Sequence, residues 1–148
     1  MANAVIKRAE TDDEVLSVAP LKRADDSECI RQVISEEVAL ERVIEWRERH
    51  YDVWIARSGD DTVGYAVGEK KGESYQSYGI YVAPLYRNGG IGTMLKAAQI
   101  DHARQCSCEY IWSNTSETNR PSIRVHEKHG FRFEPSGAGY IVSKRLQD

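Results

Sequence analysis

The spacing of apolar residues changes several times along the first part of the chain, and each change predicts a different element. Residues 4 to 9 form a short mixed apolar and basic run that predicts an opening strand. Thr11 and Glu14 have the spacing of a capping box, so a first helix is expected to begin there. Pro20 is expected to end or kink this helix, and a second helical piece is predicted from Asp25 to Val33.

A further helix and three strands are predicted in the middle of the chain. Ser35 can cap the helix, and helical spacing predicts one buried stripe formed by Leu40, Val43, Ile44 and Arg47. Three β-type runs separated by turns then predict an antiparallel meander, with strands at residues 52–57, 62–67 and 74–82. Gly79 is a candidate bulge in the last of these strands.

The last part of the chain alternates helices and strands. A helix is predicted after Pro84, with a buried stripe of Ile91, Met94, Leu95 and Ala98. The remaining elements are a strand at 109–113, a helix from Pro121 to His129 ended by Gly130, and strands at 131–133 and 140–144 joined through 135–137. The strand at 74–82 is expected to run parallel to the strand at 109–113, because a crossover helix returns the chain in the same direction.

Composition supports this outline and narrows the function. A chain of 148 residues with 41% hydrophobic and 29% charged residues suits one globular domain, so residues 1–148 are predicted to form a single α+β domain. Its sheet is expected to be mixed, mostly antiparallel and flanked by helices. The net charge of −3 gives no general attraction to phosphate backbones, so a nucleic-acid partner is not expected.

Targeting segments and metal ligands are not evident in the sequence. No apolar run suits a signal peptide, and none reaches the roughly 18 residues of a membrane span, so a cytoplasmic protein without a membrane partner is expected. Cys29, Cys106 and Cys108 are expected to be reduced. Too few further ligands stand at suitable spacing, so no metal site is predicted.

The segment from Arg87 to Thr93 carries the strongest chemical signal. It joins a strand to an amphipathic helix, so the free amides of the helix end and the helix dipole converge on one point, which suits a phosphate. The three glycines at 89, 90 and 92 allow close backbone approach, and the Arg87 guanidinium suits phosphate oxygens. The P-loop and the G-x-G-x-x-G fingerprint are both absent, so nucleotide hydrolysis and dinucleotide binding are not favoured.

Two segments resemble the signatures of the GNAT superfamily of N-acetyltransferases. Residues 82–95 match the pattern [QR]-x-x-G-x-[GA] at Arg87, Gly90 and Gly92. About forty residues later, residues 119–131 resemble the second signature, an Asn followed by a helix that ends in Gly-Phe. Residues 20–26 and 53–57 also look similar to GNAT-like proteins of tailed phages.

The resemblance implies a fold, a cofactor and a reaction. The sheet is expected to splay between its fourth and fifth strands, with acetyl-CoA in the gap and the acetyl group passing directly to a primary amine. The cofactor-binding residues that it implies are Ile80, Tyr81, Val82, Arg87, Asn88, Gly89, Gly90, Ile91, Gly92, Thr93 and Asn119. The acceptor is expected to be a small-molecule or protein amine, and the protein to be a monomer or a homodimer.

Two positions depart from the family pattern. His126 stands where many relatives carry a Tyr that protonates the thiolate, and Gln76 stands near the place of a Glu base. Acid catalysis is therefore predicted for His126, whereas the base stays open between Glu73, Glu69, Tyr78 and water. These departures leave a second hypothesis, in which the chain is a non-catalytic CoA-binding or virion assembly module that keeps the GNAT fold.

Overall fold

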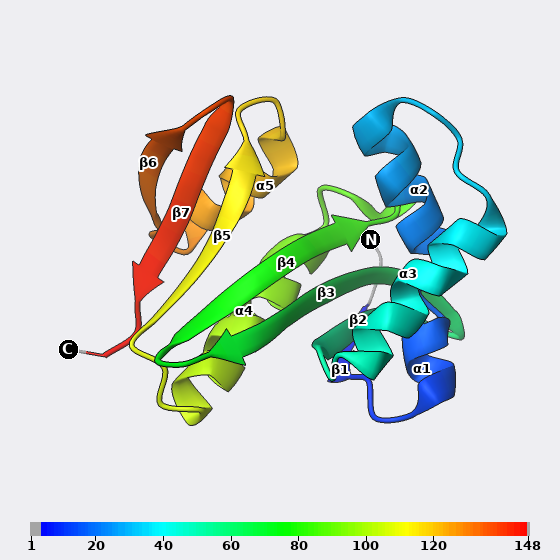
Figure 1. Ribbon diagram of the computed structural model, residues 1–148, viewed down its shortest axis with the longest axis horizontal. Coiled ribbons are helices and arrows are strands. Elements are labelled where there is room, and N and C mark those ends of the chain that lie inside the picture. The colour runs from blue at the N-terminus through cyan, green and yellow to red at the C-terminus, as the bar shows by residue number, and fades with distance from the viewer. Residues whose placement is uncertain (1–3, 148) are drawn as a thin grey trace.

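The computed structural model describes residues 4–147, which form one seven-stranded sheet with helices on both faces. The strand order is β1-β2-β3-β4-β5-β7-β6, and every neighbouring pair is antiparallel except β4 with β5 (Figure 1). The strands are β1 (Val5–Arg8), β2 (Asp52–Ser58), β3 (Asp61–Lys71), β4 (Ser74–Val82), β5 (Tyr110–Ser116), β6 (Arg132–Ser136) and β7 (Gly139–Arg145). The predicted mixed, mostly antiparallel α+β fold is confirmed.

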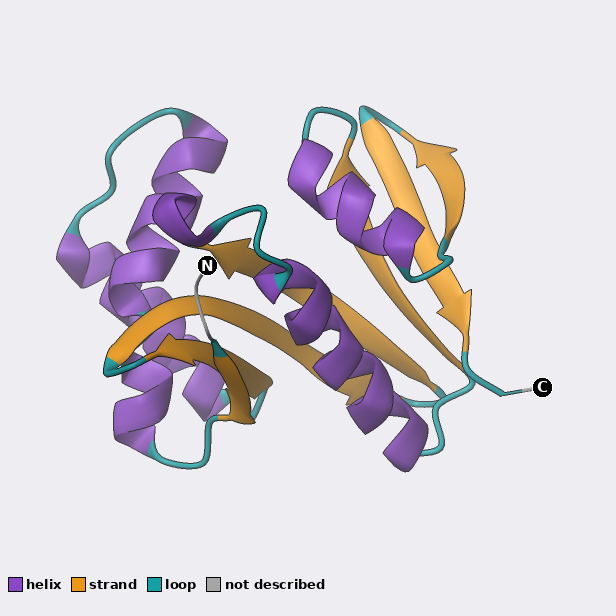
Figure 2. Ribbon diagram, turned by 180° about the vertical axis from the view of Figure 1, so that it is seen from behind, coloured by secondary structure: helices purple, strands orange, loops and turns teal. Residues whose placement is uncertain are grey.

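The helices divide between the two faces of the sheet. They are α1 (Asp12–Leu16), α2 (Ala19–Ile30), α3 (Glu36–Glu48), α4 (Ile91–Gln105) and α5 (Arg120–Lys128), with a 3-10 turn η1 (Pro84–Tyr86) before α4. One buried cluster joins α1, α2 and α3 to one face, and a second lies under α4 on the opposite face. Figure 2 shows α4 and α5 side by side on that opposite face.

The N-terminal helices begin as predicted but divide differently. Thr11 and Glu14 form both hydrogen bonds of the capping box. Pro20 does not end a helix: it lies in the first turn of α2, where its missing N–H breaks no intrahelical bond. The prediction of a second helix from residue 25 was therefore wrong, since α2 begins at Ala19 and ends at Ile30, followed by Arg31 in the left-handed region.

Two predicted stripes needed correction. On α3 the buried residues are Ala39, Val43 and Trp46, whose ring packs against Tyr65 of the sheet, whereas Leu40 is 39% exposed. On α4 the predicted Met94 is 43% exposed, whereas the polar residues Lys96 and Gln99 are buried. A helix packed against both the sheet and α5 buries a wider face than a single-stripe helix.

The centre of the sheet has two irregularities, a bulge in β4 and a short pairing between β4 and β5. In the β3–β4 pair, Val67 lies opposite Gly79 and Gly68 opposite Ser77, so Tyr78 forms a bulge beside the predicted Gly79. Strands β4 and β5 pair only at Ser74–Tyr110, Tyr75–Ile111 and Gln76–Trp112. Beyond these pairs the two strands diverge, as Figure 1 shows. The predicted splay between the fourth and fifth strands is confirmed.

Candidate functional site

The turn before α4 presents a row of free backbone donors. Within residues 4–147, none of the N–H groups of residues 88–93 donates a hydrogen bond to a protein acceptor, and no side chain caps the helix. Unpaired amides at the N-terminus of a 15-residue helix form a natural anion site. The turn therefore presents the free donors that an anion needs, and its binding of phosphate stays a prediction.

Backbone conformation explains why this turn contains glycine. Gly90 has a φ of +87°, and Asn88 also lies in the left-handed region with a φ of +66°. A Cβ on Gly92 would lie 3.3 Å from Cγ2 of Val125, so α5 leaves little room for a larger residue at that position. These constraints hold the amides in one orientation without any side chain in front of them.

The side chains of Arg87 and Tyr81 both contact Glu28 of α2. The Arg87 Nε donates to the Val82 carbonyl at 2.8 Å, and its Nη2 lies 3.3 Å from a Glu28 carboxylate oxygen. The guanidinium also lies 5.2 Å from the centroid of the Tyr81 ring, whose hydroxyl donates to Glu28 at 2.9 Å. Both side chains thus tie the turn to α2, whereas their predicted contacts with the cofactor stay predictions.

The C-terminal part of β4 has free backbone groups that face the gap between β4 and β5. Ala83 N–H donates to the Val63 carbonyl at 2.8 Å, so the alternate residues Ile80 and Val82 turn their backbone groups away from β3. That direction faces the gap left by β5. The Val82 carbonyl is occupied by Arg87, which leaves the Val82 N–H and both groups of Ile80 for an extended ligand.

The opposite side of the gap is bordered by β5 and α5. Asn119 caps α5 by accepting a hydrogen bond from Ser122 N–H at 3.2 Å. The hydroxyls of Thr115 and Ser122 lie 2.5 Å apart and join β5 to the helix. Asn119 is exposed, so its predicted contact with the cofactor depends on a ligand reaching over the start of α5.

A chain of hydrogen bonds closes the gap at its narrow end. The Ser113 hydroxyl of β5 donates to the Ser77 carbonyl of β4 at 3.0 Å. The Ser77 hydroxyl donates to the Gln99 amide oxygen at 3.0 Å, and the Gln99 amide nitrogen donates to the Val67 carbonyl at 3.2 Å beside the bulge. Gln99 of α4 therefore fixes the point where the strands separate. The sequence did not reveal this role, because a Gln on a helix is usually exposed.

Two buried polar groups lie between α4 and α5. Lys96 is fully buried, which lowers the pKa of its ammonium to about 7. His126 is 4% exposed, and burial, followed by the charge of Lys96, lowers the pKa of its imidazole to about 3. The Phe131 ring contacts both: its centroid lies 5.6 Å from the Lys96 Nζ and 4.7 Å from the imidazole centroid. The sequence singles out His126, whose predicted acid role stays a prediction, but gives no sign that Lys96 is buried.

The candidate bases lie on β3, on β4 and in the turn between these strands. The Tyr78 hydroxyl donates to Glu69 at 2.6 Å, and partial burial with this bond raises the pKa of the phenol above its ordinary value. Both residues lie beside the bulge at the narrow end of the gap. Glu73 lies in the turn before β4, next to the paired end, and is exposed. The structure therefore brings Tyr78 and Glu69 together but leaves Glu73 outside the gap.

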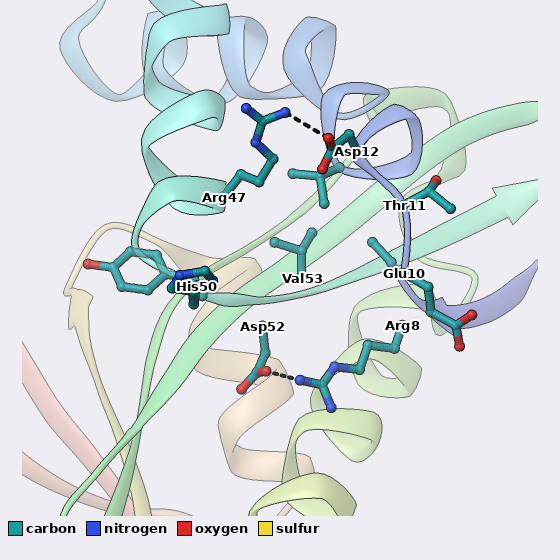
Figure 3. A pocket seen from close by; sticks show the side chains of 11 residues that line it. Arg8, Glu10, Thr11, Asp12, Arg47, His50, Asp52 and Val53 are labelled. Carbon is teal, nitrogen blue, oxygen red and sulfur yellow. Dashed lines mark hydrogen bonds and ion pairs between the residues drawn. The ribbon is translucent and has the colours of Figure 1, made fainter.

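A separate pocket of about 220 Å³ lies between β1, α1, α3 and β2 (Figure 3). Its wall includes an ion pair between Arg47 and Asp12 at 3.0 Å and another between Arg8 and Asp52. No residue of the glycine turn, β4 or β5 lines this pocket. It is therefore distinct from the candidate site.

The described residues contain no group of three or more metal-type ligands that could hold an ion. Cys29, Cys106 and Cys108 are free thiols. None of the helices described here is both long and apolar enough to cross a membrane.

Comparisons with known proteins agree with this geometry. Residues 9–131 match the Acetyltransferase (GNAT) family, so the chain belongs to this family of acyltransferases. It is 35% identical over 54 residues to streptothricin acetyltransferase from Streptomyces lavendulae, a match that covers 36% of this chain and 29% of that protein. The chain thus spans under a third of the length of this curated relative.

Solved structures show the same fold over nearly the whole chain. A GNAT family protein from Desulfovibrio desulfuricans has a TM-score of 0.77 at 23% identity, covering 98% of this chain and all of that chain. The yncA protein of Salmonella typhimurium, solved with acetyl-CoA, has a TM-score of 0.75 at 16% identity, covering 98% and 95%. The PaiA N-acetyltransferase of Thermoplasma acidophilum, solved with coenzyme A, has a TM-score of 0.75 at 14% identity, covering 95% and 99%.

The family expected from the two motifs is confirmed by these matches. The similarity of residues 20–26 and 53–57 to phage-encoded proteins stays a prediction, as do the cytoplasmic location and the monomeric or homodimeric state.

Proposed function

We propose that this chain is an acetyl-CoA-dependent N-acetyltransferase that moves the acetyl group directly to a primary amine. The observation that carries the proposal is the row of unpaired N–H groups of residues 88–93 at the start of α4, beside a gap between two strands. Family membership and the structural neighbours solved with acetyl-CoA or coenzyme A support the same cofactor.

The protein groups fit the chemical parts of this cofactor. The amides of the turn suit its pyrophosphate, since they converge at a helix N-terminus and no acidic side chain of the turn opposes the charge. The free backbone groups of Ile80 and Val82 suit the amide-bearing arm, which can lie along β4 as an added strand. The cofactor supplies an activated acetyl thioester at the end of that arm.

We propose that the amine approaches from the face of the sheet that carries α1 to α3. Tyr78 and Glu69 lie beside the bulge, and the Tyr78 phenol donates a hydrogen bond to the Glu69 carboxylate. We propose that this pair, with water, receives the proton that the amine loses as its nitrogen attacks the carbonyl carbon. The acceptor itself is a small-molecule or protein amine.

Calorimetry with acetyl-CoA and coenzyme A tests the cofactor step. Gly90→Ala is expected to weaken binding by about tenfold or more, because a Cβ at a φ of +87° displaces the neighbouring amides. Gly59→Ala is the matched control: Gly59 also has a positive φ, +62°, but lies in the β2–β3 turn. Equal binding by both variants, or no binding by the native protein, would contradict the proposal.

Thiol release with a panel of primary amines tests the transfer step. One observation favours the alternative of a CoA-binding or assembly module, because buried neutral His126 is a poor acid near neutral pH. Tight CoA binding without thiol release for any amine would support that alternative. Amine-dependent thiol release at a rate above that of denatured protein would support the transferase.

A further inference from the structure

The gap between β4 and β5 ends at a hydrogen bond between two serines. The last backbone pair of the two strands is Gln76 with Trp112. The next residue of each strand lies outside this ladder, and there the Ser113 hydroxyl donates to the Ser77 carbonyl at 3.0 Å. Among residues 4–147, no hydrogen bond joins β4 to β5 beyond this serine contact. The serine contact is therefore the floor of the gap.

A buried side chain of α4 holds the serine contact in place. The Ser77 hydroxyl donates to the Gln99 amide oxygen at 3.0 Å, and the Gln99 amide nitrogen donates to the Val67 carbonyl at 3.2 Å. Ser77, Gln99 and Ser113 are all buried. Because a buried polar group that loses its partner destabilises the protein, this chain of hydrogen bonds opposes any opening of the floor.

The arm of coenzyme A, laid along β4, has the length to reach the serine contact. Between the pyrophosphate and the sulfur, the arm has a backbone of about twelve bonds, which equals about four residues of extended chain or roughly 14 Å. The free backbone groups of Val82 and Ile80 suit an arm on the last residues of β4. Four residues before Val82 is Tyr78, and the residue before that is Ser77. The acyl group of an arm that begins beside Val82 therefore lies next to the floor.

The floor leaves room for a short acyl group only. Hydrogen-bonded strands lie about 4.8 Å apart, so no carbon chain can pass between β4 and β5 below the serine contact. On the face that carries α4, buried Gln99 lies behind Ser77. On the other face, a longer chain would occupy the side of the amine's proposed approach. Each methylene beyond an acetyl methyl must therefore break the serine contact or obstruct the amine.

We propose that Ser113 sets the length of the acyl group that this protein accepts, and that Gln99 is a positioning residue that holds Ser77 against it. This inference rests on the proposed function, but it concerns the acyl group rather than the amine. An acetyl group fits above the serine contact, whereas propionyl and butyryl groups do not. Ser113 takes no part in the bond changes of the transfer, so its replacement changes which thioester is accepted and not the reaction.

Calorimetry with acetyl-, propionyl- and butyryl-CoA is the first test, because it needs neither an amine nor turnover. The native protein is expected to bind butyryl-CoA at least about tenfold more weakly than acetyl-CoA, since a single methylene changes recognition by roughly 10–200-fold. Ser113→Gly removes the hydroxymethyl group and with it the serine contact. This variant is expected to bind all three thioesters with similar affinity and to keep the native affinity for acetyl-CoA.

The ratio of kcat/KM between the three thioesters is the second test. Ser113→Ala keeps the Cβ but loses the hydrogen bond, so it is expected to accept propionyl-CoA better than the native protein does. Gln99→Met, which cannot bind Ser77, is expected to shift the ratio in the same direction, an effect that lost stability alone would not produce. Ser74→Ala is the matched control: its hydroxyl donates to the Lys71 carbonyl at 3.2 Å in the β3–β4 turn, so its loss should leave the ratio unchanged.

Two results would overturn the inference: equal affinity of the native protein for the three thioesters, or an unchanged preference in a Ser113→Gly protein that still binds acetyl-CoA. If Ser113→Gly does not fold, the same comparison with Ser113→Ala decides the matter. Failure of the proposed function gives a different result. The native protein would then release no thiol with any amine, while the order of the three affinities would still test Ser113.

Discussion

The burial of Lys96 predicts that its replacement by Met stabilises the protein. The pKa falls from 10.5 to about 7 on folding, which corresponds to about 5 kcal/mol at about 1.4 kcal/mol per unit. Even buried ion pairs, which keep a counter-ion, can be replaced by well-packed apolar side chains with no loss or with a gain of about 1–4 kcal/mol. We therefore expect Lys96→Met to raise the free energy of unfolding by about 2–4 kcal/mol near pH 6.

The pH dependence of this gain has a definite sign. Because the folded-state pKa is lowered, the unfolded state binds more protons between about pH 7 and 10.5, so Lys96 makes native stability rise with pH across that window. Below about pH 7, Lys96 is protonated in both states, so its cost to the free energy of unfolding has its full value. The gain from Lys96→Met should therefore be largest there and shrink toward pH 10.

Urea unfolding followed by circular dichroism at several pH values between about 6 and 10 measures both effects. Lys128→Met is the control, since Lys128 is exposed and its replacement should change stability by less than about 0.5 kcal/mol. The reasoning would be refuted if Lys96→Met were less stable than the native protein near pH 6. A difference between the two proteins that did not change with pH would refute it equally.

Three further substitutions test other parts of the structure. The folded-state pKa of His126, near 3, lies below the ordinary 6.5, so His126 lowers the free energy of unfolding as the pH falls from 6.5 to about 3. His126→Leu should therefore lose less stability than the native protein over this pH range. An unchanged acid unfolding curve by circular dichroism would contradict this. Thr11→Ala should lower the free energy of unfolding by about 1 kcal/mol in urea titrations through loss of the capping box; an equal loss in Ser116→Ala would show that the effect is not capping. Gly139→Ala should cost roughly 2 kcal/mol or more, because its Cβ would lie 2.1 Å from the Thr115 carbonyl oxygen; an unchanged melting temperature would count against the tight β5–β7 contact.

The fold was largely predictable because its local signals agree with its tertiary structure. The capping box at Thr11, the meander and the glycine turn each act through nearby residues, so the sequence contains them in full. Pro20 was misinterpreted because the same residue that breaks a helix interior favours its first turn. The choice between these roles depends on where α2 begins, which its contacts with α3 and the sheet decide.

The site was predictable where it depends on backbone and less so where it depends on side-chain direction. The free amides of residues 88–93 follow from the strand, turn and helix order. The orientation of Tyr81 toward Glu28 depends on the register of β4 after the bulge at Tyr78, which no local pattern specifies. Lys96 was missed because a lysine within a helix usually indicates solvent, and only the approach of α5 and Phe131 buries it.

The three residue pairs between β4 and β5 also bear on how the molecule opens. Strands β1 to β4 form one set of continuous hydrogen-bonded ladders and β5 to β7 another, so each set can exchange its amide protons as a separate cooperative unit. A ligand that binds the edges of both units would link their opening. Cofactor binding should therefore slow hydrogen exchange in β7, a strand that the ligand need not touch.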